Sequence, residues 1–452
     1  MKKNIWQQFL RSDSLKKKVG ITLGLVVIYK ILSVIPVPGV SQEAVQSMRD
    51  VFSNQPGLVF FSSLMGGGLE RFSIILMGLS PYINASIILQ LLSVVIPKLE
   101  EIKKEGAQGQ KKINMYTRWL TIPLAFVQGY GMILLLNSLV QGASIVDTSN
   151  WGSLLSMMTI ITAGTVLLMW LGEQINESGI GNGISMIIFA GILSDVPGRI
   201  ATQLSSVVWS GSAKDIIVAL IPFFILLGLT LGVIYIIIKF TEGYRRIPLV
   251  YTKTGRDERS YFPIRINQAG MIPIIFAMSL VTFPYILGQA LIVRGAGLPE
   301  FIKSAAQLFV NLFNPNTPTW SFVVIFMALV IGFSFFYLSI TFDTKEVAES
   351  IQKRGGYIPG IRPGRQTADY LRTVSNHLNF FGGTFIAVIA VFPYVATLVN
   401  NMLKVNNIPS LNMAQIDFLI SGSGLIIVVG VVLELLRRFT AELQSHDYRR
   451  FF

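Results

Sequence analysis

Few residues in this sequence have the type and spacing that catalysis requires. Only two histidines are present, His377 and His446, and no H-E-x-x-H pair could bind a catalytic zinc ion. The glycine-rich stretch SGIGNGIS (178–185) lacks the lysine of a G-x-x-x-x-G-K-[ST] phosphate-binding loop, so a tight turn between two helices is the better interpretation. Cysteine is absent, which excludes thiolate chemistry and disulfides. We therefore expect no catalytic residue, no metal site and no cofactor.

Carboxylates at mid-membrane depth would indicate ion-coupled transport, because they are costly there and are kept for function. In this chain the acids of the apolar segments lie near segment ends, as do Glu173, Asp417 and Glu434. This pattern disfavours an inverted-repeat secondary transporter of a small solute, which we keep as the alternative function. An intramembrane enzyme has no set of catalytic residues to support it.

The elements that carry these residues are apolar runs. The chain has 452 residues, of which 52% are hydrophobic and 13% charged. Runs long enough to cross about 30 Å of hydrocarbon as helices are centred near residues 28, 84, 128, 163, 194, 228, 280, 331, 388 and 427. The fifth is weak, because Asp195, Pro197 and Arg199 interrupt it. The composition predicts an all-α, polytopic membrane protein with ten transmembrane helices.

Positive charge alternates between the loops. The amino terminus and the loop after the second run are rich in lysine, whereas the loop after the third run, 137–152, has no lysine or arginine. The loops at about 240–266 and 343–374 are basic again. By the positive-inside rule, this pattern predicts both termini in the cytoplasm. Much of the net charge of +13 is this orientation signal, and an anionic cytoplasmic partner is compatible with the excess.

A short motif occurs twice. GLSPYINA (78–85) in the second run and GMIPIIFA (270–277) in the seventh share the pattern G-x-x-P-x-I-x-A. The two runs cross in opposite directions, which is typical of an inverted repeat with its axis in the membrane plane. We expect two five-helix halves, 1–210 and 211–452, although two unrelated proline-containing helices would give the same match. Pro81 is interpreted as a kink in a buried helix, and Asn84 as an amide that needs a partner.

The segment before the second run is apolar but short. In PGLVFFSSLMGGGLERF (56–72), eight apolar or small residues precede three glycines, and a helix of that length covers only about 12 Å. We expect it to be re-entrant or interfacial on the outer side, with the glycines as a hinge. A surface helix is the alternative.

Isoleucines recur beside these irregular segments. Ile83 and Ile87 are spaced i, i+4, Ile188 and Ile192 repeat that spacing, and Ile275 matches Ile83 in the repeat. Taken alone, the spacing is typical of packed or lipid-facing helices, and a hydrophobic constriction is the alternative interpretation.

Several long segments also resemble a known family. They include PYINASIILQLL, EIKKEGAQGQKKINMYTR, GEQINESGIGNGISMIIFAGI, NQAGMIPIIFA, GGYIPGIRPGRQTADYL and GSGLIIVVGVVLELL, in order along the whole chain. The chain resembles the bacterial SecY family, the channel subunits of the Sec protein translocon. The resemblance implies a non-enzymatic, multi-pass protein of the bacterial cytoplasmic membrane, with two inverted five-helix halves clamped by SecE and flanked by SecG.

The resemblance also assigns site residues. It places a ring of apolar side chains that narrows the pore at Ile83, Ile87, Ile188, Ile192, Ile275 and Ile427. It places a plug helix at about 58–70, with Phe60, Phe61, Ser62, Ser63, Leu64, Met65, Gly66, Gly67 and Gly68. The lateral gate, formed by helices two, three, seven and eight, would contain Pro81, Asn84, Gln128 and Pro273. Docking of SecA and the ribosome would involve Arg245, Arg246, Arg256, Arg259 and Arg362.

Together these features predict a protein-conducting channel. Unfolded secretory polypeptides and signal peptides would pass through the pore, and transmembrane segments would leave sideways to meet membrane lipids. The resemblance implies that SecA, ribosomal elongation or the proton-motive force supplies the energy. A dry apolar collar would exclude ions and still seal around chains of any sequence.

Overall fold

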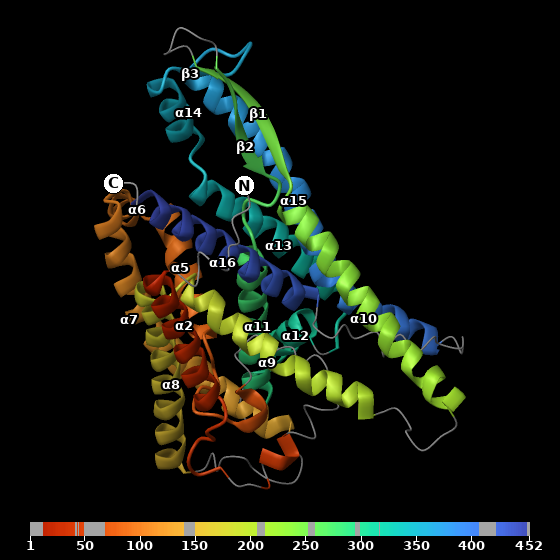
Figure 1. The fold of residues 1–452 in the computed structure, drawn as a ribbon. Helices are drawn as coiled ribbons and strands as arrows, with labels where there is room; N and C mark the ends of the chain where they lie inside the picture. Colours follow the sequence, from red (N-terminus) through yellow and green to blue (C-terminus); the bar gives the residue numbers. More distant parts are fainter. Residues whose placement is uncertain are drawn as a thin grey trace. The chain divides into compact units, whose positions relative to one another are not determined.

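The computed structural model (Figure 1) describes residues 12–40, 43, 45–48, 68–139, 150–205, 213–251, 258–293, 299–315, 317–405 and 422–449. Helices make up most of this part of the chain. The main helices are α2 (Asp13–Leu32), α5 (Ser80–Val95), α6 (Pro97–Lys104), α7 (Ala107–Leu139), α8 (Trp151–Ser178), α9 (Gly183–Ser205), α10 (Ala213–Thr241), α11 (Ile272–Val293), α12 (Glu300–Phe313), α13 (Trp320–Thr341), α15 (Arg365–Val405) and α16 (Gly422–Arg449). The shorter elements are η1 (Leu69–Arg71), α14 (Thr344–Lys353), β1 (Tyr244–Tyr251), β2 (Glu258–Arg265) and β3 (Gly356–Tyr357).

The predicted apolar runs lie in helices. Each of the ten predicted centres falls inside one of α2, α5, α7, α8, α9, α10, α11, α13, α15 and α16. Among the described residues, six helices are long and apolar enough to cross a membrane, and α5 with α6 makes a seventh candidate that bends by 102°. The all-α, polytopic membrane fold is confirmed, and a count of ten spans is consistent with it.

Within the chain, two compact units can be described separately. Unit 1 comprises Met1–Phe223, Ser279–Phe322 and Val431–Phe452, and unit 2 comprises Phe224–Met278 and Val323–Gly430. These units follow packing density, whereas the predicted halves 1–210 and 211–452 follow the sequence repeat. The division into repeat halves therefore stays a prediction.

The core of unit 1 surrounds an irregular segment between η1 and α5. The N–H of Val37 donates to the carbonyl of Phe72 (2.8 Å), and the N–H of Ile74 donates to the carbonyl of Ile35 (3.0 Å). α8 approaches so closely that a Cβ atom at Gly164 would lie 1.9 Å from the carbonyl oxygen of Ile74. Phe72 is fully buried and has φ +47°, the only positive φ at a described non-glycine residue. Backbone pairing and close helix packing thus fix this segment, because buried backbone groups need partners.

The two copies of the sequence motif begin their helices in the same way. Gly78 and Gly270 have φ values of +53° and +65°, a conformation that glycine adopts without steric cost. Pro81 and Pro273 are the second residues of α5 and α11. At that position proline removes no helical hydrogen bond, since the first N–H groups of a helix have no partner within the helix. The interpretation of Pro81 as a kink is therefore wrong, because the residue lies in the first turn of α5.

Unit 2 contains a small sheet that the sequence analysis did not predict. Its strand order is β2-β1-β3, all neighbours are antiparallel, and Arg246 of β1 pairs with Pro263 of β2. One face is buried on α14 and on the N-terminal part of α15, with Ile247, Leu249 and Leu371 in the shared core (Figure 1). α15 is a single helix of 41 residues, about 60 Å long at 1.5 Å per residue. It therefore extends well beyond the roughly 30 Å of a bilayer core.

Candidate functional site

Four of the six predicted pore isoleucines lie in unit 1. Ile83 and Ile87 are on α5, Ile188 and Ile192 are on α9, and all four side chains are buried. Each pair is spaced i, i+4, so its members share one face of their helix. Because α5 starts at Ser80, Ile83 lies in its first turn, directly after the buried segment that follows η1.

The other two isoleucines lie in unit 2. Ile427 of α16 is fully buried, and Ile275 of α11 is partly buried. The N–H of Ile275 donates to the carbonyl of Met271, and a Cβ atom at Gly430 would lie 3.4 Å from the Cβ atom of Met271. α16 thus packs closely against the start of α11, with Ile427 one turn from the glycine contact. The joining of all six isoleucines into one ring stays a prediction.

α7 and the C-terminal part of α11 meet inside unit 1, where the resemblance predicts a gate. A Cβ atom at Gly131 would lie 2.8 Å from Cγ2 of Ile286 and 3.9 Å from Cβ of Ala290. Met132 and Ile286 also belong to one buried apolar cluster. The glycine lets the two helices approach closely, which is typical of helix packing in membranes. Sequence analysis missed Gly131, although a small residue three positions after Gln128 was a usable signal.

Gln128 is on the same face of α7, one turn before Gly131. Its side chain is 2% exposed, and within the described part of the chain neither amide atom has a hydrogen-bond partner. An unpaired buried amide costs free energy, so this residue destabilises the arrangement in which it is found. Asn84, Pro81 and Pro273 are also buried, and their assignment to a gate stays a prediction.

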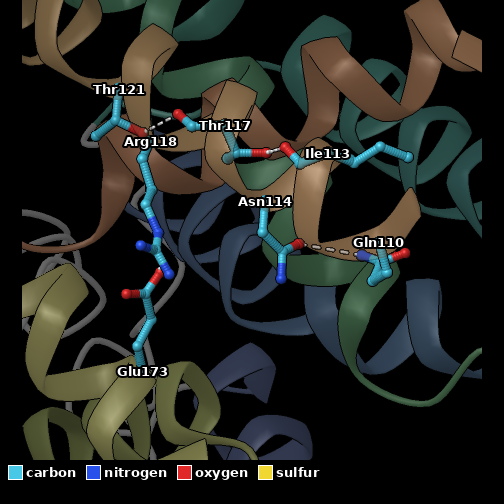
Figure 2. Close-up of polar contacts among 7 residues, drawn as sticks. All are labelled: Gln110, Ile113, Asn114, Thr117, Arg118, Thr121 and Glu173. Carbon is cyan, nitrogen blue, oxygen red and sulfur yellow. Dashed lines mark hydrogen bonds and ion pairs between the residues drawn. The ribbon is translucent and has the colours of Figure 1, made fainter. Parts of the chain in front are cut away.

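An ion pair connects α7 and α8 (Figure 2). Nε of Arg118 donates to Oε1 of Glu173 at 2.6 Å, and the side chains are 48% and 19% exposed. Figure 2 also shows Thr117 and Thr121 donating to backbone carbonyls of α7, at 2.9 and 2.7 Å. The pair joins residues 55 positions apart. The sequence analysis identified Glu173 only as an acid at a span end, because no local pattern links it to Arg118.

The sheet of unit 2 presents an arginine between two aromatic rings. Nη2 of Arg246 donates to the Tyr244 hydroxyl at 2.9 Å, and its guanidinium carbon lies 5.2 Å and 4.9 Å from the ring centroids of Tyr244 and Tyr261. The hydrogen bond to Tyr244 raises the pKa of Arg246 further above its already high value, so the group is always charged. Arg245 is exposed beside it. Arg259 lies in β2, and Arg256 falls outside the described residues.

Arg362 occupies a tight turn between β3 and α15. Gly360 and Gly364 on either side have φ values of +81° and +94°. The Thr367 hydroxyl donates to the carbonyl of Arg362 at 3.0 Å, which fixes the backbone, while the arginine itself is exposed. The turn thus fixes the backbone that carries this exposed cation.

Most of the predicted plug lies outside the described residues, namely Phe60, Phe61, Ser62, Ser63, Leu64, Met65, Gly66 and Gly67. Gly68 is described and buried, and a Cβ atom there would lie 2.4 Å from Oγ of Ser73. Among the described residues, no group of three or more histidine, aspartate or glutamate side chains could bind a metal ion.

Comparison with known proteins gives one consistent result. The SecY family model matches residues 73–436. The protein translocase subunit SecY of Streptomyces scabiei is 37% identical over 455 residues, covering 98% of each chain. The subunit of the same name from Staphylococcus aureus strain NCTC 8325 is 36% identical over 452 residues, again covering 98% of each chain.

Solved structures with the same fold are more distant in sequence. One, described as a protein-conducting channel, has a TM-score of 0.66 and 19% identity, covering 95% of this chain and 92% of its own. Another is Sec61 in the canine ribosome–channel complex, with a TM-score of 0.62, 19% identity and the same coverage. At 19% sequence identity, these two structures support the assignment of the fold alone.

Proposed function

The chain belongs to the SecY family, and from this premise we propose that it is a protein-conducting channel of the bacterial cytoplasmic membrane. It moves unfolded secretory polypeptides across the membrane and releases transmembrane segments into the bilayer. The observation that carries the proposal is the shared helix start of α5 and α11, a left-handed glycine three residues before a proline, followed in each copy by an isoleucine. Such a helix start, repeated in two helices that the span count predicts to cross in opposite directions, supports a pathway between inverted halves.

We assign the pore constriction to Ile83, Ile87, Ile188, Ile192, Ile275 and Ile427. A narrow apolar collar resists wetting and therefore blocks ions when no chain is present. Isoleucine offers no hydrogen bond or charge, so the collar contacts any passing sequence without selecting it. Gly68 and the packed segment after it would anchor the plug. A side chain at position 68 would displace Ser73, so the chain is tightly packed at this point.

The contact of α7 with α11 supports a gate that can part. Gly131 permits close packing, while the unpaired amide of Gln128 makes the closed arrangement less stable than a fully apolar one would be. An entering signal peptide or water supplies partners for that amide. We assign Asn84, Pro81 and Pro273 to the same gate, with the prolines defining where α5 and α11 begin.

We further propose that the sheet of unit 2 and the Arg362 turn bind cytoplasmic partners, with both chain termini on the same side. Arg246 is pre-oriented by its two tyrosines, which suits contact with ribosomal RNA phosphates or with acidic side chains of SecA. SecE and SecG are the expected membrane partners of the channel. The relatives' name, protein translocase subunit, supports an assembly of this kind.

The pore assignment can be tested by disulfide crosslinking, because the chain has no cysteine of its own. A secretory chain with one cysteine is stalled in the channel of the Ile83→Cys variant. We expect a crosslink at position 83 and none in the matched control Ile88→Cys, whose parent side chain is exposed on the same helix. The pore assignment fails if export-competent membranes give no crosslink at 83, or an equal one at 88.

A further inference from the structure

Helix α12 has a surface that no other described part of the chain covers. We propose that α12 lies in the membrane–water interface and inserts an apolar stripe among the lipid acyl chains, on the face of the membrane where α11 ends and α13 begins. The proposal requires only that the chain is a membrane protein, and it goes beyond the translocation function.

The sequence of α12, EFIKSAAQLFVNLF, divides into three faces at about 100° per residue. The packed face includes Ala306, which is fully buried, and Val310 and Phe313, which contact the core of unit 1. The polar face contains Glu300, Lys303, Ser304, Gln307 and Asn311. The third face contains Phe301, Ala305, Leu308, Phe309 and Leu312.

The third face is apolar, and its large side chains Phe301, Leu308 and Phe309 are exposed, while Ala305 and Leu312 are partly buried. Phe301 is 82% exposed and Leu308 is 56% exposed. In water, a helix with one packed face would be expected to present polar residues on the rest of its surface. This second apolar face therefore contacts something other than water. Adjacent apolar and polar faces, with a large aromatic side chain at one end, are typical of interfacial helices.

The position of α12 identifies the occupant as lipid. The helix packs against the last part of α11, where a Cβ atom at Gly288 would lie 2.9 Å from the carbonyl of Ala306 and 3.0 Å from Cγ2 of Val310. The final turn of α11 exposes Leu291 and Ile292, which continue the apolar surface.

After α12, the chain continues to α13, which begins at Trp320. The indole of Trp320 is 47% exposed. Tryptophan is enriched at the membrane–water interface. Along the chain, the exposed stripe is therefore flanked on both sides by exposed apolar and aromatic side chains, which supports lipid as its occupant.

The test uses single-cysteine variants of the otherwise cysteine-free chain, labelled with the fluorophore NBD in lipid nanodiscs, where both membrane faces are accessible. Phe301→Cys and Leu308→Cys report on the apolar stripe, and Gln307→Cys reports on the polar face. We expect blue-shifted emission at 301 and 308, quenching by lipids with a nitroxide at acyl carbon 5, and several-fold weaker quenching by iodide than at 307.

Either of two results would overturn the proposal. Strong iodide quenching at 301 and 308, equal to that at 307, would show that the stripe faces water. Shielding from both iodide and nitroxide lipids would show that protein covers it. Two reporter positions are used so that one poorly folded variant does not decide the outcome.

Discussion

Replacing Gln128 by leucine should make the channel harder to open. The amide is 2% exposed, and both of its polar atoms lack a partner in the described part of the chain. An unpaired buried polar group costs about 1–3 kcal/mol, and a leucine of similar size would remove that cost from the closed arrangement only. Taking about 2 kcal/mol, the opening equilibrium should fall about 30-fold, since each 1.4 kcal/mol is tenfold.

The assay is the concentration of a synthetic signal peptide that half-activates ion conductance in planar bilayers. If only the open state binds the peptide, the midpoint should rise by the same factor of about 30. The matched control is Gln110→Leu, on the same helix, where the exposed glutamine bonds to Asn114 and no shift is expected. A Gln128→Leu channel that opens as readily as the parent, or more readily, would refute the reasoning.

Three further changes test the other assignments. Arg362→Glu should abolish SecA-driven export in inverted membrane vesicles while insertion and SecE binding persist, because we assign this exposed cation to SecA docking; normal export would contradict the docking role. Arg246→Ala should weaken ribosome binding about fivefold and lower its salt slope by about 1, as expected for one lost phosphate contact, whereas Tyr244→Phe should have a smaller effect. Gly270→Ala should lower stability by about 1–2 kcal/mol through its left-handed backbone, measured as a lower midpoint of thermal unfolding in detergent, while Gly332→Ala, with open space around its Cβ position, should not.

Hydropathy located the helices but not where they begin. Every predicted span centre lies in a helix, because burial in lipid demands long apolar segments with internal hydrogen bonding. The start of α5 was missed because the residues before Ser80 are as apolar as those after it. The left-handed backbone at Gly78 ends the preceding turn, and no apolar periodicity records that change.

The candidate site residues also divide into those that a local sequence pattern distinguishes and those that it does not. Gln128 and Arg362 were assigned by family resemblance, although an amide in an apolar run and an arginine between two glycines also stand out by residue type and neighbours. The isoleucines could not be separated from ordinary core residues by spacing, and family resemblance alone assigned them. The pairing of Arg118 with Glu173 depends on how α7 packs on α8, which no local pattern contains.

Helix α15 has a mechanical consequence. Its first turns are packed into the sheet core through Leu371 and Val374, and the helix continues to Val405 with Pro393 inside it. An α-helix resists bending where every turn is held by its backbone hydrogen bonds, and in α15 proline interrupts that pattern at Pro393. A force applied to the sheet is therefore delivered as torque along the part of α15 that precedes Pro393. The sheet and this part of α15 tilt together, so a push on the sheet from outside the bilayer also tilts the part of the helix that lies within the bilayer.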